Sequence, residues 1–144
     1  MTKRLFADAF NLLCYGDKIG SGSFRDVWQC RLDSKMVVKV ERDDTQWRNF
    51  HNIHEAKFWS DNEHYEKVSK WLAPVEYVSP DGFILIQRKV EPIPKDYKLP
   101  EKLPAFLTDI KPSNFGLLDG KLVCIDYGLN NSNPSLKLTK ANWE

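Results

Sequence analysis

The sequence lacks any long apolar segment, any internal repeat and any excess of charge of one sign. No run approaches the roughly 18 apolar residues of a membrane-spanning helix, and the first residues lack the apolar stretch of a signal peptide. The 21 basic and 20 acidic residues give a net charge of +1, which provides no reason to expect nucleic acid or a membrane as a partner. We therefore expect a cytoplasmic protein that does not bind membranes.

Cysteine is also scarce. Cys14, Cys30 and Cys124 cannot all pair within one chain, and their spacing does not fit a zinc site. The simplest interpretation is three reduced thiols, as in a cytosol. Apolar residues make up 42% of the 144 positions and aromatic residues 12%. This is enough to build the core of one domain, or of two small lobes that share a cleft.

The order of the predicted elements is that of an α+β protein. Strands are indicated by β-branched runs, helices by apolar residues at helical spacing, and turns by glycine, proline and aspartate. In chain order we expect a helix over 5–13, two strands around a glycine turn within 17–31, a strand over 36–40, a helix from about 43 to 59, a short helix within 65–72, a hairpin over 75–87, a proline-rich linker over 92–104, a hairpin over 117–125, and a polar tail over 131–144.

The segment with the most chemical content is Asp-Ile-Lys-Pro-Ser-Asn at 109–114, followed by Asp126. In a phosphoryl-transfer site, Asp109 would accept the proton of the attacking hydroxyl and Lys111 would steady the phosphoryl group. Asn114 and Asp126 offer the oxygen ligands that Mg²⁺ prefers. The alternative is ordinary turn chemistry at 109–114 and a strand end at Asp126.

A glycine turn lies between the first two predicted strands and contains Gly20, Ser21, Gly22 and Ser23, with Val27 just beyond it. Glycines let a backbone approach phosphate groups closely and direct N–H groups at them. Taken alone, such a sequence is more often only a hairpin turn. Its place between two strands favours phosphate binding more than its residues alone do.

A lysine and a glutamate complete the candidate set. Lys39 alternates with valines on a predicted strand, sharing a face with Val37, and its burial would be costly unless it is paired. Glu55, sixteen residues further on, lies on a predicted helix that could cross the sheet and meet it. The alternatives are an edge-strand lysine that faces solvent and a surface glutamate.

In this order, the motifs resemble those of eukaryotic-type protein kinases over roughly residues 15–130. The resemblance implies a kinase-like fold with an antiparallel small-lobe sheet and one main helix over about 15–91, a linker over 92–104, and a minimal large lobe of loops and hairpins over 105–130. It implies binding of ATP and Mg²⁺, with a loop at Gly20–Gly22, an anchor at Lys39 paired with Glu55, and a strand at 84–91 leading to an adenine-holding hinge. In that hinge Gln87 and Lys89 are candidate contacts.

The chain also departs from the family pattern. Arg25 stands where a third glycine is usual, Leu107-Thr108 replaces a His-Arg pair, and Gly116 falls where the adenine site usually has a bulky apolar floor. Residues 92–108 are too few for the two helices that normally precede the catalytic loop, and no Ala-Pro-Glu sequence follows Gly128. A conventional platform for peptide substrates is therefore not expected.

Three functions follow from this pattern. The first is an active phosphotransferase for Ser or Thr hydroxyls of a protein or of the chain itself. The second is a kinase-like binding module that docks on a partner protein and modulates it. The third, less favoured because of Lys111, is a kinase for aminoglycosides or lipids. The economy of the chain suggests a viral or mobile-element origin, with a host protein or a second copy covering the cleft.

Overall fold

The computed structural model describes residues 14–22, 24–42, 50–128 and 134–144. The helix expected over 5–13 and the start of the helix expected from 43 lie outside these ranges. The described elements, in chain order, are β1 (Tyr15–Ser21), β2 (Arg25–Cys30), β3 (Met36–Glu41), α2 (His51–Asn62), α3 (Glu66–Ser69), β4 (Val75–Val78), β5 (Ile84–Arg88), β6 (Lys102–Pro104), the 3-10 turn η1 (Pro112–Asn114), β7 (Phe115–Leu118), β8 (Lys121–Cys124) and β9 (Leu138–Lys140).

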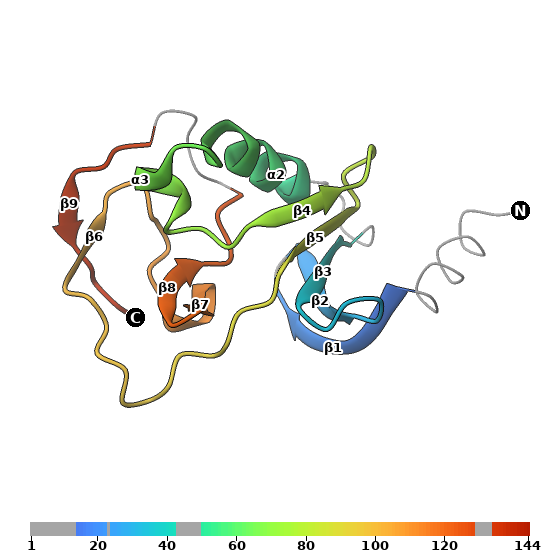
Figure 1. The fold of residues 1–144 in the computed structure, drawn as a ribbon, viewed down its shortest axis with the longest axis horizontal. Coiled ribbons are helices and arrows are strands. Elements are labelled where there is room, and N and C mark those ends of the chain that lie inside the picture. Colours follow the sequence, from blue (N-terminus) through green and yellow to red (C-terminus); the bar gives the residue numbers. More distant parts are fainter. Residues whose placement is uncertain (1–13, 23, 43–49, 129–133) are drawn as a thin grey trace, which may run out of the picture.

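A five-stranded antiparallel sheet forms one half of the molecule, with strand order β1-β2-β3-β5-β4 (Figure 1). The predicted α+β class and antiparallel sheet are thereby confirmed. β3 lies between β2 and β5, and Lys39 is opposite Val27 on one side and Leu85 on the other. Lys39 therefore belongs to an interior strand, which rules out the edge-strand alternative.

The alternation of side chains along β3 explains how the sheet serves two purposes. Val38 packs with Tyr15 and Cys30 in a small apolar cluster on one face. Val37 and Lys39 have the opposite parity, so they project to the other face. That face is covered by α2, which contacts β3, β4 and β5. A charged side chain on this face must therefore find its partners on the helix or beyond it.

Helix α2 differs from its prediction at the C-terminal end. A break was expected at residues 60–62, but the helix continues through Asn62. Two local contacts offset the low helix propensity there: Lys57 pairs with Asp61 at 2.7 Å, and the Asn62 side chain donates to the carbonyl of Phe58 at 2.9 Å. At the other end Phe50 has a left-handed φ of 56°, which turns the chain into the helix.

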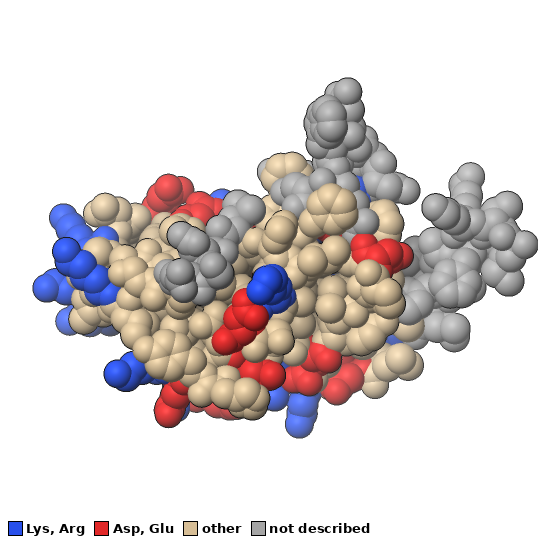
Figure 2. Space-filling view, turned by 90° about the horizontal axis from the view of Figure 1, so that it is seen from above, with Lys and Arg blue, Asp and Glu red and all other residues tan. Residues whose placement is uncertain are grey.

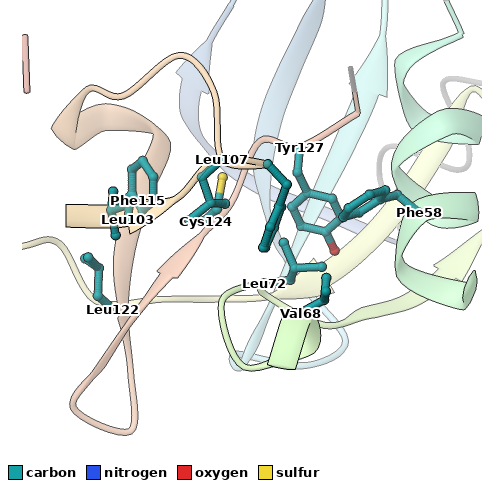
Figure 3. Close-up of a cluster of buried hydrophobic side chains, with 10 residues drawn as sticks. Phe58, Val68, Leu72, Leu103, Leu107, Phe115, Leu122, Cys124 and Tyr127 are labelled. Carbon is teal, nitrogen blue, oxygen red and sulfur yellow. The ribbon is translucent and has the colours of Figure 1, made fainter. Parts of the chain in front are cut away.

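The second half of the molecule is built from short pieces around a larger apolar core. The β7–β8 hairpin, expected over 117–125, lies between the sheet and the β6–β9 pair (Figure 1). Figure 3 shows that side chains from α2, α3, the β6 segment and the hairpin converge here. The buried members are Phe58, Val68, Leu72, Leu103, Phe106, Leu107, Phe115, Leu122, Cys124 and Tyr127.

The segment expected to be a polar tail is in fact packed. Its strand β9 pairs with β6, which itself lies at the end of the expected linker. The ring of Trp143 meets Phe115 edge-on at a centroid distance of 5.1 Å, and its N–H donates to the carbonyl of Pro100 at 2.9 Å. The N–H of Glu144 donates to the carbonyl of Ile110 at 3.2 Å, so the C-terminal residues brace the 109–114 loop.

The surface has no dominant charge on the face shown in Figure 2, where acidic and basic side chains are mixed over a largely uncharged surface. Basic side chains gather at the end that carries β6 and β9, where Lys102, Lys137 and Lys140 are exposed. Among the described helices, none is both long enough and apolar enough to cross a membrane.

Candidate functional site

The predicted meeting of Lys39 and Glu55 occurs in the structure. The Lys39 ammonium lies 2.7 Å from Glu55 Oε1, and the two side chains are only 4% and 0% exposed. β3 supplies the lysine and α2 supplies the glutamate, because the helix crosses the face of the sheet on which Lys39 projects. The surface-glutamate alternative is wrong. A buried pair of this kind is costly to desolvate and needs further hydrogen bonds to be stable.

Those further bonds come from the segment around Asp126. The Lys39 ammonium also donates to the carbonyl oxygen of Ile125. The N–H of Tyr127 donates to Glu55 Oε2 at 2.9 Å. Glu55 and Lys39 are thus each tied to the chain beside Asp126, more than 70 residues away in sequence. The two halves of the predicted site are joined through the buried ion pair.

A third charged group, Arg25, completes what we call the charged cluster: Arg25, Lys39, Glu55 and Asp126. The Arg25 guanidinium is bidentate to Glu55, with Nη–Oε distances of 3.1 and 3.2 Å. It also donates to Asp126 Oδ1 at 3.1 Å and to the Asn52 side-chain oxygen at 3.0 Å. Arg25 is 7% exposed and stands at the start of β2, directly after the glycine turn.

The electrostatics of the cluster favour the ionised carboxylate. Burial alone would raise the pKa of Glu55, but Arg25 and Lys39 outweigh burial and lower this pKa from 4.5 to about 2. Burial lowers the pKa of Lys39, with a further contribution from the nearby Arg25. Burial would lower the pKa of Arg25, but Glu55 and Asp126 raise it. Glu55 is therefore a fixed negative charge that holds two cations at the base of the site.

Two uncharged side chains hold the cluster in place. Asn52, which is fully buried, donates to the backbone carbonyls of Lys39 and Phe83 while its oxygen accepts from Arg25. Tyr127 is 1% exposed, and its hydroxyl donates to the carbonyl of Ala73 at 2.6 Å. Asn52 ties α2 to the sheet, and Tyr127 ties the segment after β8 to the segment after α3.

The loop at 109–114 is organised differently. Asp109 has a left-handed φ of 51°, a conformation that aspartate tolerates better than most residues. The Asn114 side chain donates to both the backbone oxygen and the Oδ2 of Asp109, at 2.9 Å each. Lys111 is 3.5 Å from the same carboxylate, but the two side chains are 40% and 59% exposed. The carboxylate is thus positioned by the loop itself and faces solvent.

The predicted metal ligands lie on adjoining segments. The N–H of Ile125, next to Asp126, donates to the carbonyl of Asn114 at 2.9 Å, which brings the two segments together. The side chain of Asp126 is 46% exposed. No group of three or more His, Cys, Asp or Glu side chains arranged to hold a metal occurs among the described residues. A cation here would depend on Asp126, on an amide oxygen and on ligands from outside the protein.

The predicted nucleotide-contacting residues of the sheet have mixed positions. Gly20 and Ser21 end β1, Gly22 donates its N–H to the Arg25 carbonyl, and Ser23 lies outside the described residues. The Ser21 hydroxyl donates to Asp26 at 2.6 Å. Val27 and Val37 lie on β2 and β3, partly buried and buried respectively. The glycine turn therefore leads directly into the strand that carries Arg25.

Gln87 and Lys89 already have partners within the protein. Gln87 is 1% exposed, with its amide nitrogen 3.4 Å from the carbonyl of Ala73. The Lys89 ammonium donates to the side chain of Gln29 at 2.7 Å, and its N–H donates to the carbonyl of Lys35. These contacts give both side chains a structural position at the end of β5.

Gly116 is a glycine for a packing reason. Leu117 and Glu91 form an antiparallel bridge, with both N–H···O distances at 2.8 Å. A Cβ added at Gly116 would lie 2.2 Å from Val90 Cγ2 and 2.9 Å from the Glu91 carbonyl oxygen. The segment after β5 thus lies directly against β7, at the position where the resemblance to protein kinases would place a bulky apolar floor of the adenine site.

The surface hollow between α2 and the β4–β5 turn is separate from the charged cluster. Its volume is about 460 Å³, and it is lined by Ile53, Ala56, Lys57, Ser60, Tyr77, Val78, Ser79 and Pro80. None of these belongs to the predicted site. The predicted site is described by the side-chain contacts given above.

Sequence reasoning missed Arg25, Asn52 and Tyr127 as members of the site. Arg25 was noticed only as a bulky replacement for a glycine, and its burial depends on partners 30 and 101 residues away. For Arg25, parity with Val27 on the same strand was an available signal, because Val27 pairs with Lys39. Asn52 lies one helical turn before Glu55, on the same face of α2.

Comparison with known proteins adds no assignment. No family model matches the chain, and none of the curated proteins matches it. The function is therefore argued from the residues of the site.

Proposed function

We propose that this protein is an ATP- and Mg²⁺-dependent phosphotransferase of the protein-kinase type, acting on Ser or Thr hydroxyls of a protein or of the chain itself. The observation that carries the proposal is the tie between its two halves. The buried Lys39–Glu55 pair bonds to the backbone on both sides of Asp126. The resemblance of the motif order to protein kinases and the α+β fold with its antiparallel sheet support it as well.

The donor atoms present fit both ligands. An ammonium has three N–H donors, and Glu55 Oε1 and the Ile125 carbonyl engage two of the three on Lys39. A phosphate oxygen would take the third, which requires the nucleotide to reach an ammonium whose side chain is 4% exposed. The amide nitrogen of Asn114 is bound to Asp109, so its other terminal atom is an oxygen. Together with Asp126 it offers the hard oxygen ligands that Mg²⁺ prefers.

ATP would supply the transferable phosphoryl group, and Mg²⁺ would neutralise the charge on its phosphates. The residues of this chain supply position and charge. Lys39 holds the phosphate side of the site, and Glu55 fixes the Lys39 ammonium in place. Asp109 accepts the proton of the acceptor hydroxyl, and its exposed carboxylate can be reached by a substrate. Lys111, beside Asp109, adds a positive charge where the phosphoryl group passes.

Transfer of label from γ-labelled ATP tests this proposal, with the protein itself and a generic protein as acceptors. We expect Asp109→Asn to lose about 100-fold or more of the transfer rate, the size of a lost general base. Asp119→Asn is the matched control, because Asp119 is exposed and has nearly the same φ, 52° against 51°. Equal transfer by the two variants would contradict the role of Asp109.

A binding module that modulates a partner protein is the second candidate. The observation in its favour is the Arg25–Asp126 ion pair at 3.1 Å, which engages one oxygen of the proposed metal ligand. Nucleotide that raises the melting temperature without transfer to any acceptor would favour this candidate. Nucleotide that leaves the melting temperature unchanged would contradict the phosphotransferase and any nucleotide-binding form of the module, and would leave only a module that docks without nucleotide.

A further inference from the structure

Arg25 makes an unusual set of contacts for a residue next to a glycine turn. It is buried, bidentate to Glu55, bonded to Asn52, and paired with Asp126. Three of these four bonds would remain if the bond to Asp126 opened. The side chain of Asp126 is 46% exposed, so its carboxylate can leave Arg25 and be hydrated by solvent instead. The Arg25–Asp126 bond is therefore the one contact of the cluster that can open at low cost.

The charges of the cluster balance only because Arg25 is present. Arg25 and Lys39 contribute two positive charges, and Glu55 and Asp126 contribute two negative charges. A divalent cation at Asp126 would approach the same carboxylate that the guanidinium already contacts. A metal ion on that carboxylate would lie close to the guanidinium, and two positive charges repel. Guanidinium and metal ion thus compete for Asp126.

We propose that Arg25 is a built-in competitor of the divalent metal ion, so that the Arg25–Asp126 ion pair must open before metal binds at Asp126. The inference deepens the proposed function, on which it rests for the role of Asp126 as a metal ligand. It assigns Arg25 as the residue that sets metal affinity. In the free protein Arg25 neutralises the charged cluster. When the metal ion binds, Arg25 loses its bond to Asp126 and keeps its bonds to Glu55 and Asn52.

Binding of Mn²⁺ alone, without nucleotide, tests the competition through the paramagnetic relaxation of water protons. Arg25→Met keeps the length and apolar stem of the side chain and removes its charge. We expect it to bind Mn²⁺ about tenfold more tightly or better, the affinity equivalent of one charge-assisted hydrogen bond. The gain should disappear in Arg25→Met combined with Asp126→Asn. An unchanged affinity in the single variant, or a gain that persists in the double variant, would overturn the proposal.

The unsubstituted protein provides a second measurement in case Arg25→Met does not fold. The side-chain N–H signals of Arg25 in nuclear magnetic resonance spectra should shift during a Mg²⁺ titration, as the bond to Asp126 is lost. In Asp126→Asn the same titration should leave them unchanged. Signals that stay fixed in the unsubstituted protein at saturating Mg²⁺, or Mg²⁺ that never binds, would contradict the competition.

These metal titrations are independent of the transfer assay. Should they fail while label is transferred from ATP, Arg25 is a structural partner of Glu55 and the phosphotransferase proposal stands. Should transfer fail while the titrations succeed, Asp126 is a metal ligand controlled by Arg25 in a protein of another activity.

Discussion

The charged cluster and the 109–114 loop hold their charges in opposite ways. Lys39 and Glu55 are 4% and 0% exposed and are fixed by several short bonds. Asp109 and Lys111 are 59% and 40% exposed and meet at 3.5 Å. In the first arrangement the charges are removed from water, and the ion pair and its hydrogen bonds must offset the free energy of desolvation. The second leaves the charges hydrated and available to whatever approaches.

The difference indicates a division of work. The buried, multiply bonded Lys39–Glu55 pair of the cluster cannot adapt much, so it suits a ligand part that is always the same, such as a phosphate chain. An exposed carboxylate on a loop can meet acceptors of different shape. Stability should therefore depend strongly on the cluster and weakly on the loop, while chemistry should depend on both.

The largest effect is expected at Glu55. Glu55→Gln keeps the shape of the side chain but leaves Lys39 and Arg25 buried without their shared carboxylate. The free energy of unfolding should fall by about 3–5 kcal/mol, the usual consequence of breaking a buried pair. Chemical denaturation measures it. Glu76→Gln on β4, where the side chain is exposed, should stay within about 0.5 kcal/mol of the unsubstituted protein. Equal effects would contradict the buried role of Glu55.

Acid should act through the same residue. The pKa of Glu55 is lowered in the folded protein from 4.5 to about 2. A lowered folded-state pKa contributes stability that is fully present above pH 4.5 and is lost as the pH falls toward 2. The melting temperature should therefore decline across this interval, and the decline should be shallower in Glu55→Gln. A parallel decline in both proteins would show that other carboxylates are responsible.

A smaller effect is expected where the segment after β5 meets β7. In Gly116→Ala the new Cβ would overlap Val90 and approach the Glu91 carbonyl. We expect a loss of about 1–3 kcal/mol in the free energy of unfolding, typical of overpacking. Gly20→Ala is the matched control, because a Cβ there has no atom within 4 Å among the described residues. A Gly116 variant as stable as the Gly20 variant would mean that this contact is loose.

The smallest stability effect among these substitutions is expected at Tyr127. Tyr127→Phe removes the 2.6 Å hydrogen bond to the Ala73 carbonyl but keeps the ring against Phe58. The free energy of unfolding should fall by about 1 kcal/mol. Tyr77→Phe, at a tyrosine that is 49% exposed, should have almost no effect. Indistinguishable unfolding curves for the two variants would show that the tie through Tyr127 contributes nothing.

Local pattern was enough to predict much of the fold. The β-branched run over 36–40 gave β3 and the parity of Lys39, and turn residues gave the hairpins at β4–β5 and β7–β8. The C-terminal end of α2 was missed because Lys57–Asp61 and Asn62–Phe58 contacts offset residues that usually break helices. The packing of Trp143 was missed because its partners, Pro100 and Phe115, are distant in sequence.

The candidate site divides in the same way. Lys39, Glu55 and the 109–114 loop were recognisable because their residue types and order carry the chemistry. Arg25 was not, because a guanidinium beside a glycine turn is ordinarily at the surface. Only the folded chain brings it against Glu55 and Asp126 at once. The parity of Arg25 with Val27 indicates the face on which it lies, but its partners on two other segments cannot be identified from that pattern.

The most direct test of the division between cluster and loop measures nucleotide binding and transfer together in two variants. ATP with Mg²⁺ should raise the melting temperature of the unsubstituted protein and of Asp109→Asn equally, while Asp109→Asn loses about 100-fold or more of the transfer rate. Lys39→Met should lose the rise in melting temperature and the transfer together. An Asp109→Asn protein that no longer responds to nucleotide, or a Lys39→Met protein that still does, would contradict the assignment of the phosphate side to the cluster and the acceptor side to the loop.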